Sequence, residues 1–166
     1  RVGQVDMFLN DIIDQPDNSS YFLGHYLFEK TQGNRYELID GQQRLTTTVI
    51  FMSCLVKELR KRKIVRFDYN NMQYATEQIY ERYLQPRYGS QKFETVPEDS
   101  SFFNRLIIEC DSDYRIETGR RSERRIREAS SFFEEKMATQ TEEGTLFKWF
   151  HVIDNAIITT FLLSSE

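Results

Sequence analysis

The sequence predicts an α+β fold, and three features of its pattern support that class. An aromatic and apolar stretch at residues 21–29 and an alternating stretch at 35–39 are separated by a polar turn, as in a β-hairpin. A long amphipathic helix follows directly, and the rest of the chain is mostly helical. The Ile- and Thr-rich segment at 156–163 then favours a further strand. A hairpin-plus-helix unit followed by a helical part is typical of α+β proteins.

The first part of the chain has clear boundaries. Apolar residues recur at helical spacing from Val2 to Ile13, and Pro16 ends that helix. The strand at 21–29 is apolar at nearly every position, which is typical of a strand covered on both faces. Apolar positions of the next helix run from Leu45 to Leu59, and the basic residues at 57–63 suit the negative end of its dipole.

The second part is expected to contain two strands and four helices before the final strand. We expect residues 1–70 to form the main unit and residues 71–166 to be a mainly helical extension of the same domain. The elements expected there are a strand at 64–69, a helix at 76–84, a loop at 86–90, a strand at 92–96, a helix from Pro97 to Ile107, a loop at 111–119, and helices at 122–137 and 145–155.

Composition limits the classes of protein that the chain can represent. Its 166 residues fit one domain, and its net charge of −4 argues against nucleic-acid binding through the whole surface. Seven glycines and three prolines are about half the usual share, which argues against disorder. No apolar run approaches the roughly 20 residues of a membrane-spanning helix, so we expect a cytoplasmic protein without a membrane partner.

The cysteines and histidines do not have the spacing of a metal site. Cys54 lies in a helical apolar pattern and is expected to be a buried free thiol, whereas Cys110 has no partner at metal-ligand spacing. His25 and His151 are expected to be packed, hydrogen-bonded histidines rather than catalysts.

One segment, Asp40-Gly41-Gln42-Gln43-Arg44-Leu45-Thr46-Thr47, combines residues suited to phosphate chemistry. It lies where a strand precedes a helix, and the first amides of a helix carry partial positive charge. Gly41 allows close approach of the backbone, and Arg44 offers a planar donor fork. The glutamine and threonine side chains can bind a ribose, a base edge or a water, and Asp40 can bind a hydroxyl or magnesium.

Helix capping is the simpler interpretation of part of this segment. Asp40 is a good N-cap, and Gln43 follows three positions later as in a capping box. On local physics alone, capping is favoured over ligand binding. Capping does not account for Gln42, Arg44 or the adjacent threonines.

This segment resembles the signature of the ParB-like N-terminal domain of GmrSD-type (type IV) restriction proteins. Weaker features of the same family are Tyr21-Phe22-Leu23-Gly24, the stretch from Leu84-Gln85-Pro86 through Lys92-Phe93 to Val96-Pro97-Glu98-Asp99, and the Ala129 to Phe133 pattern. The resemblance implies a ParB/sulfiredoxin-like fold that binds a nucleoside triphosphate (GTP, ATP or CTP) with magnesium and, in several family members, hydrolyses it.

The resemblance also implies a set of site residues. The nucleotide site comprises Asp40, Gly41, Gln42, Gln43 and Arg44, with Thr46 and Thr47 as neighbouring members. Asp40, Gln43 and Arg44 are the expected catalytic residues, and Asp40 is the expected metal ligand.

The family's upstream Gln-Arg and downstream Phe-Glu motifs, and its C-terminal nuclease, are not in this sequence. We therefore expect a piece of a longer protein, with an incomplete pocket and no nuclease centre of its own. Expected partners are a nucleotide, a C-terminal nuclease domain, DNA through the full-length protein, and a second copy in a homodimer.

An arginine cluster at 120–127 raises a second hypothesis. Arg120, Arg121, Arg124 and Arg125 are expected either to contact DNA phosphates or to pair with nearby glutamates (Glu117, Glu123 and Glu128) on a solvated face, which is the favoured interpretation. The leading function is a nucleotide-binding regulatory domain of a bacterial defence protein that acts on modified DNA. The alternative is a non-catalytic DNA-sensing module.

Overall fold

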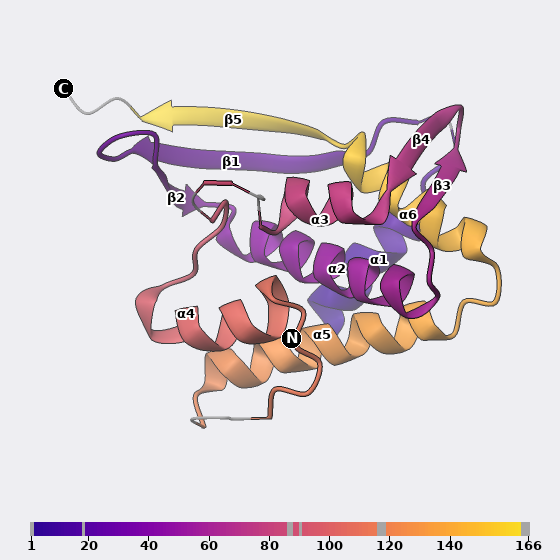
Figure 1. Ribbon diagram of the computed structural model, residues 1–166. Coiled ribbons are helices and arrows are strands. Elements are labelled where there is room, and N and C mark those ends of the chain that lie inside the picture. The colour runs from indigo at the N-terminus through magenta and orange to yellow at the C-terminus, as the bar shows by residue number, and fades with distance from the viewer. Residues whose placement is uncertain (1, 18, 86–87, 90, 116–118, 164–166) are drawn as a thin grey trace.

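The computed structural model describes residues 2–17, 19–85, 88–89, 91–115 and 119–163 (Figure 1). Within these residues, the fold is α+β, as predicted. The elements in chain order are α1 (Val2–Ile13), β1 (Phe22–Lys30), β2 (Tyr36–Asp40), α2 (Gln42–Lys61), β3 (Arg66–Tyr69), β4 (Met72–Ala75), α3 (Thr76–Tyr83), α4 (Pro97–Phe103), the π-helix η1 (Asn104–Ile108), α5 (Arg121–Ala138), α6 (Glu143–Asp154) and β5 (Ile157–Leu163).

The main sheet joins the two ends of the chain. Its strand order is β2-β1-β5, with β1 antiparallel to β2 and parallel to β5. The Ile157 N–H donates to the Tyr21 carbonyl at 2.8 Å where the parallel pair begins. Figure 1 shows β1 and β5 running side by side along one side of the molecule. The last predicted strand therefore completes the sheet of the first hairpin.

Helix α2 is the centre of the core. It is buried from Thr48 to Val56, which covers every face of the helix over more than two turns. In Figure 1 it lies beneath β1 and α3 and above α5. Phe51 contacts Phe8 of α1 and Phe133 of α5 in edge-to-face geometry, so aromatic rings from three helices meet at one point.

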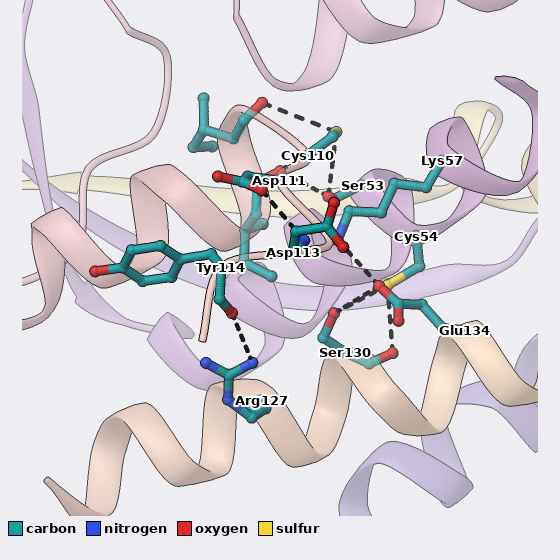
Figure 2. Close-up of polar contacts among 12 residues, drawn as sticks. Ser53, Cys54, Lys57, Cys110, Asp111, Asp113, Tyr114, Arg127, Ser130 and Glu134 are labelled. Atoms are coloured by element: carbon teal, nitrogen blue, oxygen red, sulfur yellow. Dashed lines mark hydrogen bonds and ion pairs between the residues drawn. The ribbon is translucent and has the colours of Figure 1, made fainter. Parts of the chain in front are cut away.

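Polar contacts fix α2 against α5 and η1 (Figure 2). The Lys57 ammonium lies 3.0 Å from the Glu134 carboxylate, and the Ser53 hydroxyl donates to the Ile107 carbonyl at 2.6 Å. The Cys54 thiol donates to the Ser130 carbonyl at 3.5 Å. Buried polar groups with partners of this kind restrict how two helices pack, because any other register leaves them unpaired.

The sequence prediction was wrong at three points. Residues 92–96 are not a strand, because side-chain groups bind this segment: Gln91 donates to the Phe93 carbonyl, and Phe93 packs on Phe103. Strand β4 was not predicted, and it pairs with β3 as an antiparallel hairpin. Strand β1 is not covered on both faces, since Phe22 and His25 are exposed. The predicted loop at 86–90 lies partly outside the described residues.

The outer strand β5 carries exposed apolar side chains. They are Ile157, Ile158, Phe161, Leu162 and Leu163. Within the described residues, no helix is both long enough and apolar enough to cross a membrane.

The burial of Cys54 predicts an inert thiol. Burial raises the pKa of Cys54 to about 12, and burial also raises the pKa of Cys110. Both thiols should therefore react with a thiol reagent far more slowly in the folded protein than after unfolding in guanidinium. The stabilisation linked to Cys54 is fully present below the thiol's ordinary pKa of 9.0 and is lost as the pH rises toward about 12. Rapid labelling of Cys54 in the folded protein would contradict this packing.

Candidate functional site

The turn between β2 and α2 is built around Gly41. This residue has φ 93° and occupies the N-cap of α2. A Cβ at this position would lie 2.7 Å from the Tyr26 ring and 3.2 Å from the His25 carbonyl oxygen. Both the left-handed backbone and the contact with β1 therefore require glycine.

Asp40 does not cap α2, so the capping interpretation was wrong. Asp40 is the last residue of β2, and its carboxylate accepts a 2.8 Å hydrogen bond from the adjacent Gly41 N–H. Among the described residues, no side chain caps the helix, and its first turn contains no acidic residue. The first helical hydrogen bond runs from Leu45 N–H to the Gly41 carbonyl. The amides of residues 42–44 precede that bond and form the positive end of the helix.

Arg44 is held against a second glycine. A Cβ on Gly24 of β1 would lie only 1.7 Å from Arg44 Nη1 and 2.7 Å from its Cζ. Gly24 has φ 123°, and the pairing of β1 with β5 changes register between Phe22 and Gly24. The absence of a side chain at this bulge lets the guanidinium lie directly on the strand.

These groups line a cleft of about 700 Å³ between α1, β1 and the β2–α2 turn. One wall is α2 with the turn before it, and the other is a single face of α1 with spacing i, i+3, i+4 and i+7. The lining residues are Gln4, Met7, Phe8, Asp11, Tyr21, His25, Ile39, Asp40, Gly41, Gln42, Gln43, Arg44 and Thr47.

Charged residues of the cleft shift the pKa values of two tyrosines, Tyr21 and Tyr26. Burial raises the pKa of Tyr21, the nearby Asp11 carboxylate raises it further, and Arg44 lowers it. Burial also raises the pKa of Tyr26, and the charge of Arg44 partly offsets this by lowering it. The Tyr26 hydroxyl is buried and has no hydrogen-bond partner within the described part of the chain. Tyr21 thus lies in the fields of an acid on one wall and an arginine on the other.

The structure brings most of the predicted nucleotide residues together. Asp40, Gly41, Gln42, Gln43, Arg44 and Thr47 all line the cleft, whereas Thr46 is not among its lining residues. The Gln42 side-chain amide donates to the Leu38 carbonyl at 2.7 Å, and the Thr47 hydroxyl donates to the Gln43 carbonyl at 2.8 Å. Gln42 and Thr47 therefore support the backbone of the turn.

Four polar residues of the cleft lining, from α1 and from the segment around β1, were not predicted from the sequence. Gln4, Asp11, Tyr21 and His25 line the cleft, but they were not selected from the sequence. The visible signal was the placement of polar Gln4 and Asp11 on the same helical stripe as buried Phe8. The expectation for His25 was wrong, because it is exposed and contacts the rings of Phe22 and Phe161.

His151 fulfils the prediction of a packed histidine. It is buried on α6, with its Nδ1 atom 3.0 Å from the Tyr74 hydroxyl and its Nε2 atom 3.2 Å from the Asn70 amide. No group of three or more His, Cys, Asp or Glu residues that could hold a metal occurs among the described residues.

The arginine cluster lies away from the cleft, at the start of α5. Arg120 precedes the helix and donates to the Glu98 carbonyl. Arg121, Arg124 and Arg125 are exposed and, within the described residues, form no ion pair. Of the expected glutamate partners, Glu123 is buried, and Glu117 lies outside the described residues.

Fold and site together define an α+β domain with a cleft at a strand-to-helix turn. The family model for the N-terminal domain of the GmrSD restriction endonuclease matches residues 1–166. The chain belongs to this family, and it is therefore a domain of a restriction-type defence protein. Comparison with curated proteins and with solved structures gave no match.

The contact between Arg44 and Gly24 predicts a sensitive position outside the turn. Gly24→Ala places a methyl group where the guanidinium lies and imposes a backbone angle that alanine rarely adopts. We expect a loss of about 1–3 kcal/mol in unfolding free energy, measured by chemical denaturation. Gly3→Ala is the control, because no described atom beyond its chain neighbours and its own helix backbone lies within 4 Å of its Cβ position. Equal stability of both variants would mean that Arg44 does not depend on Gly24.

Proposed function

We propose that this domain binds a nucleoside triphosphate in the cleft, hydrolyses it and thereby regulates a restriction protein that acts on modified DNA. The observation that carries the proposal is the convergence of the uncapped N-terminus of α2, the Arg44 guanidinium and the Asp40 carboxylate on one cleft. The resemblance of residues 40–47 to the family signature supports the same assignment.

The phosphates bind at the start of α2. The amides of residues 42–44 donate hydrogen bonds there, and Gly41 lets the phosphate oxygens approach the backbone. Arg44 binds two phosphate oxygens through its donor fork and neutralises their charge. Its position on Gly24 holds the guanidinium in place before the nucleotide arrives, which lowers the entropic cost of binding.

Magnesium fits this arrangement through Asp40. One carboxylate oxygen accepts the Gly41 N–H, so the side chain is oriented beside the phosphate site. Magnesium usually binds one or two carboxylates and takes its other ligands from phosphates and water. A single protein carboxylate is therefore compatible with the described residues, which hold no group of three ligands. When bound, the ion neutralises charge on the phosphate oxygens.

Hydrolysis requires a water molecule aligned with the terminal phosphate. Gln43 is exposed in the cleft, and it orients this water through its side-chain amide. Arg44 stabilises the charge that develops on the phosphate oxygens in the transition state. Gln42 and Thr47 keep the turn in shape through their hydrogen bonds to the backbone.

Replacing Arg44 tests the proposal. Arg44→Ala should weaken nucleoside triphosphate binding by about tenfold or more, since a charged hydrogen bond contributes roughly 1.5–3 kcal/mol. Arg44→Lys keeps the charge but loses the fork, and it should fall between the alanine variant and the wild type. The measurement is isothermal titration with ATP, GTP and CTP in the presence of magnesium.

Arg35→Ala is the matched control, because Arg35 is an exposed arginine paired with Glu94 outside the cleft lining. Its binding should equal that of the wild type. If Arg44→Ala also binds as the wild type does, the role of Arg44 is refuted.

A DNA-binding surface on α5 is a second candidate function, supported by an observation of its own. Arg35, Arg60, Arg62, Arg82 and Arg105 each form an ion pair with a carboxylate. By contrast, Arg121, Arg124 and Arg125 lie on one exposed face at i, i+3 and i+4 without such a partner in the described structure. Cations at a helix N-terminus oppose the helix dipole. A phosphate backbone that contacts this face offsets that repulsion.

The salt dependence of duplex DNA binding tests this surface. Each phosphate contact contributes about 0.9 to the slope of log affinity against log salt concentration. Neutralising Arg121, Arg124 and Arg125 to glutamine should lower that slope by about 2–3. The control variant neutralises the paired Arg60, Arg62 and Arg105, which changes the net charge by the same amount. In this variant the slope of log affinity against log salt concentration should fall less. Equal slopes for the triple α5 variant and the wild type would refute the surface.

A further inference from the structure

The wall of the cleft formed by α1 carries a carboxylate that the proposed phosphate site does not use. Asp11 faces the cleft from α1, opposite the start of α2. Its side chain is exposed, and its carboxylate makes no hydrogen bond or ion pair with the described residues. Asp6 on the same helix differs, because its carboxylate accepts a hydrogen bond from Asn10.

The position of Asp11 is fixed by packing. Phe8 lies on the same helical face and packs against Phe51 and Phe133, and its ring centroid is 5.8 Å from that of Phe51 and 6.0 Å from that of Phe133. This anchor sets the rotation of α1, so a residue three positions later points toward the cleft. The carboxylate is thereby presented by a rigid element rather than by a loop.

Asp11 lines the same cleft as the proposed phosphate site, but it belongs to the α1 wall. Tyr21, Asp11 and Arg44 all line this cleft, and the charges of Asp11 and Arg44 both shift the pKa of Tyr21. A carboxylate repels phosphate, so Asp11 is not a phosphate ligand. The group next to the phosphates in a nucleotide is the ribose, whose hydroxyls are hydrogen-bond donors. In dinucleotide-binding proteins of another fold, an Asp or Glu side chain accepts hydrogen bonds from the ribose hydroxyls.

From this arrangement we infer that the Asp11 carboxylate accepts hydrogen bonds from the ribose hydroxyls of the bound nucleotide and selects ribonucleotides over deoxyribonucleotides. The inference rests on the proposed nucleotide site and adds a specificity determinant to it. Because Asp11 contacts sugar rather than phosphate, its contribution is separate from that of Arg44.

The test compares three ligands on three proteins by isothermal titration with magnesium. The ligands are ATP, 2′-deoxy-ATP and inorganic triphosphate. The proteins are the wild type, Asp11→Asn and the control Asp14→Asn, an exposed aspartate outside the cleft lining with the same change in charge. Thermal melting of each variant verifies that the fold is intact.

We expect the wild type and Asp14→Asn to bind ATP about tenfold more tightly than 2′-deoxy-ATP, the scale of one hydrogen bond to a charged group. Asp11→Asn should reduce that ratio to near one and leave triphosphate binding unchanged or slightly stronger. An unchanged ratio in Asp11→Asn, with ATP still bound, overturns this inference and leaves the proposed function intact. A changed magnesium requirement without a changed ratio overturns it as well. If the wild type binds neither ATP nor triphosphate, the proposed function fails, and this inference fails with it.

Discussion

The candidate site depends on the contact between the start of α2 and strand β1. Two positions without side chains make this contact possible: Gly41 lies on the Tyr26 ring, and Gly24 lies under the Arg44 guanidinium. A methyl group at either position would push the helix or the arginine away from the strand. This close approach puts the positive end of a buried helix and a charged donor fork at the same edge of the cleft.

The rest of the fold keeps that contact in place. Helix α2 is buried through most of its length, and its Lys57, Cys54 and Ser53 side chains bind groups on α5 and near η1. Strand β1 is fixed on one side by β2 and on the other by β5. Helix α1 supplies the second wall, and Phe8 anchors it to the same core. The cleft therefore lies between elements that are positioned by burial rather than by flexible loops.

The strongest local patterns were predictable from the sequence. The long helix, the hairpin and the helical part followed from apolar spacing and turn residues, and Asp40 to Arg44 were selected as one group. The sequence did not reveal that β5 pairs with β1, because a parallel pair across more than 100 residues leaves no local signal. The same limit hid the α1 wall, since Asp11 is an ordinary exposed residue until the fold places it opposite Arg44.

The capping error has a similar physical origin. An aspartate before Gly-Gln-Gln has the pattern of an N-cap residue. In the structure, Gly41 occupies the N-cap in a left-handed conformation, and the Asp40 carboxylate accepts a hydrogen bond from the Gly41 N–H instead. The helix therefore begins one residue later than a cap at Asp40 would require, and its first amides have no side-chain cap among the described residues. The predicted strand at 92–96 does not form, because side-chain contacts rather than a partner strand hold this segment.

Nucleotide binding at the start of α2 can be followed by NMR, through the amide chemical shifts of isotope-labelled protein during titration with a nucleoside triphosphate and magnesium. If the cleft binds the nucleotide, we expect the largest shifts at the backbone amides of Gly41, Gln42, Gln43 and Arg44, with smaller shifts on the α1 face that carries Asp11. Saturable shifts confined to other parts of the molecule, or no shifts at all, would contradict it.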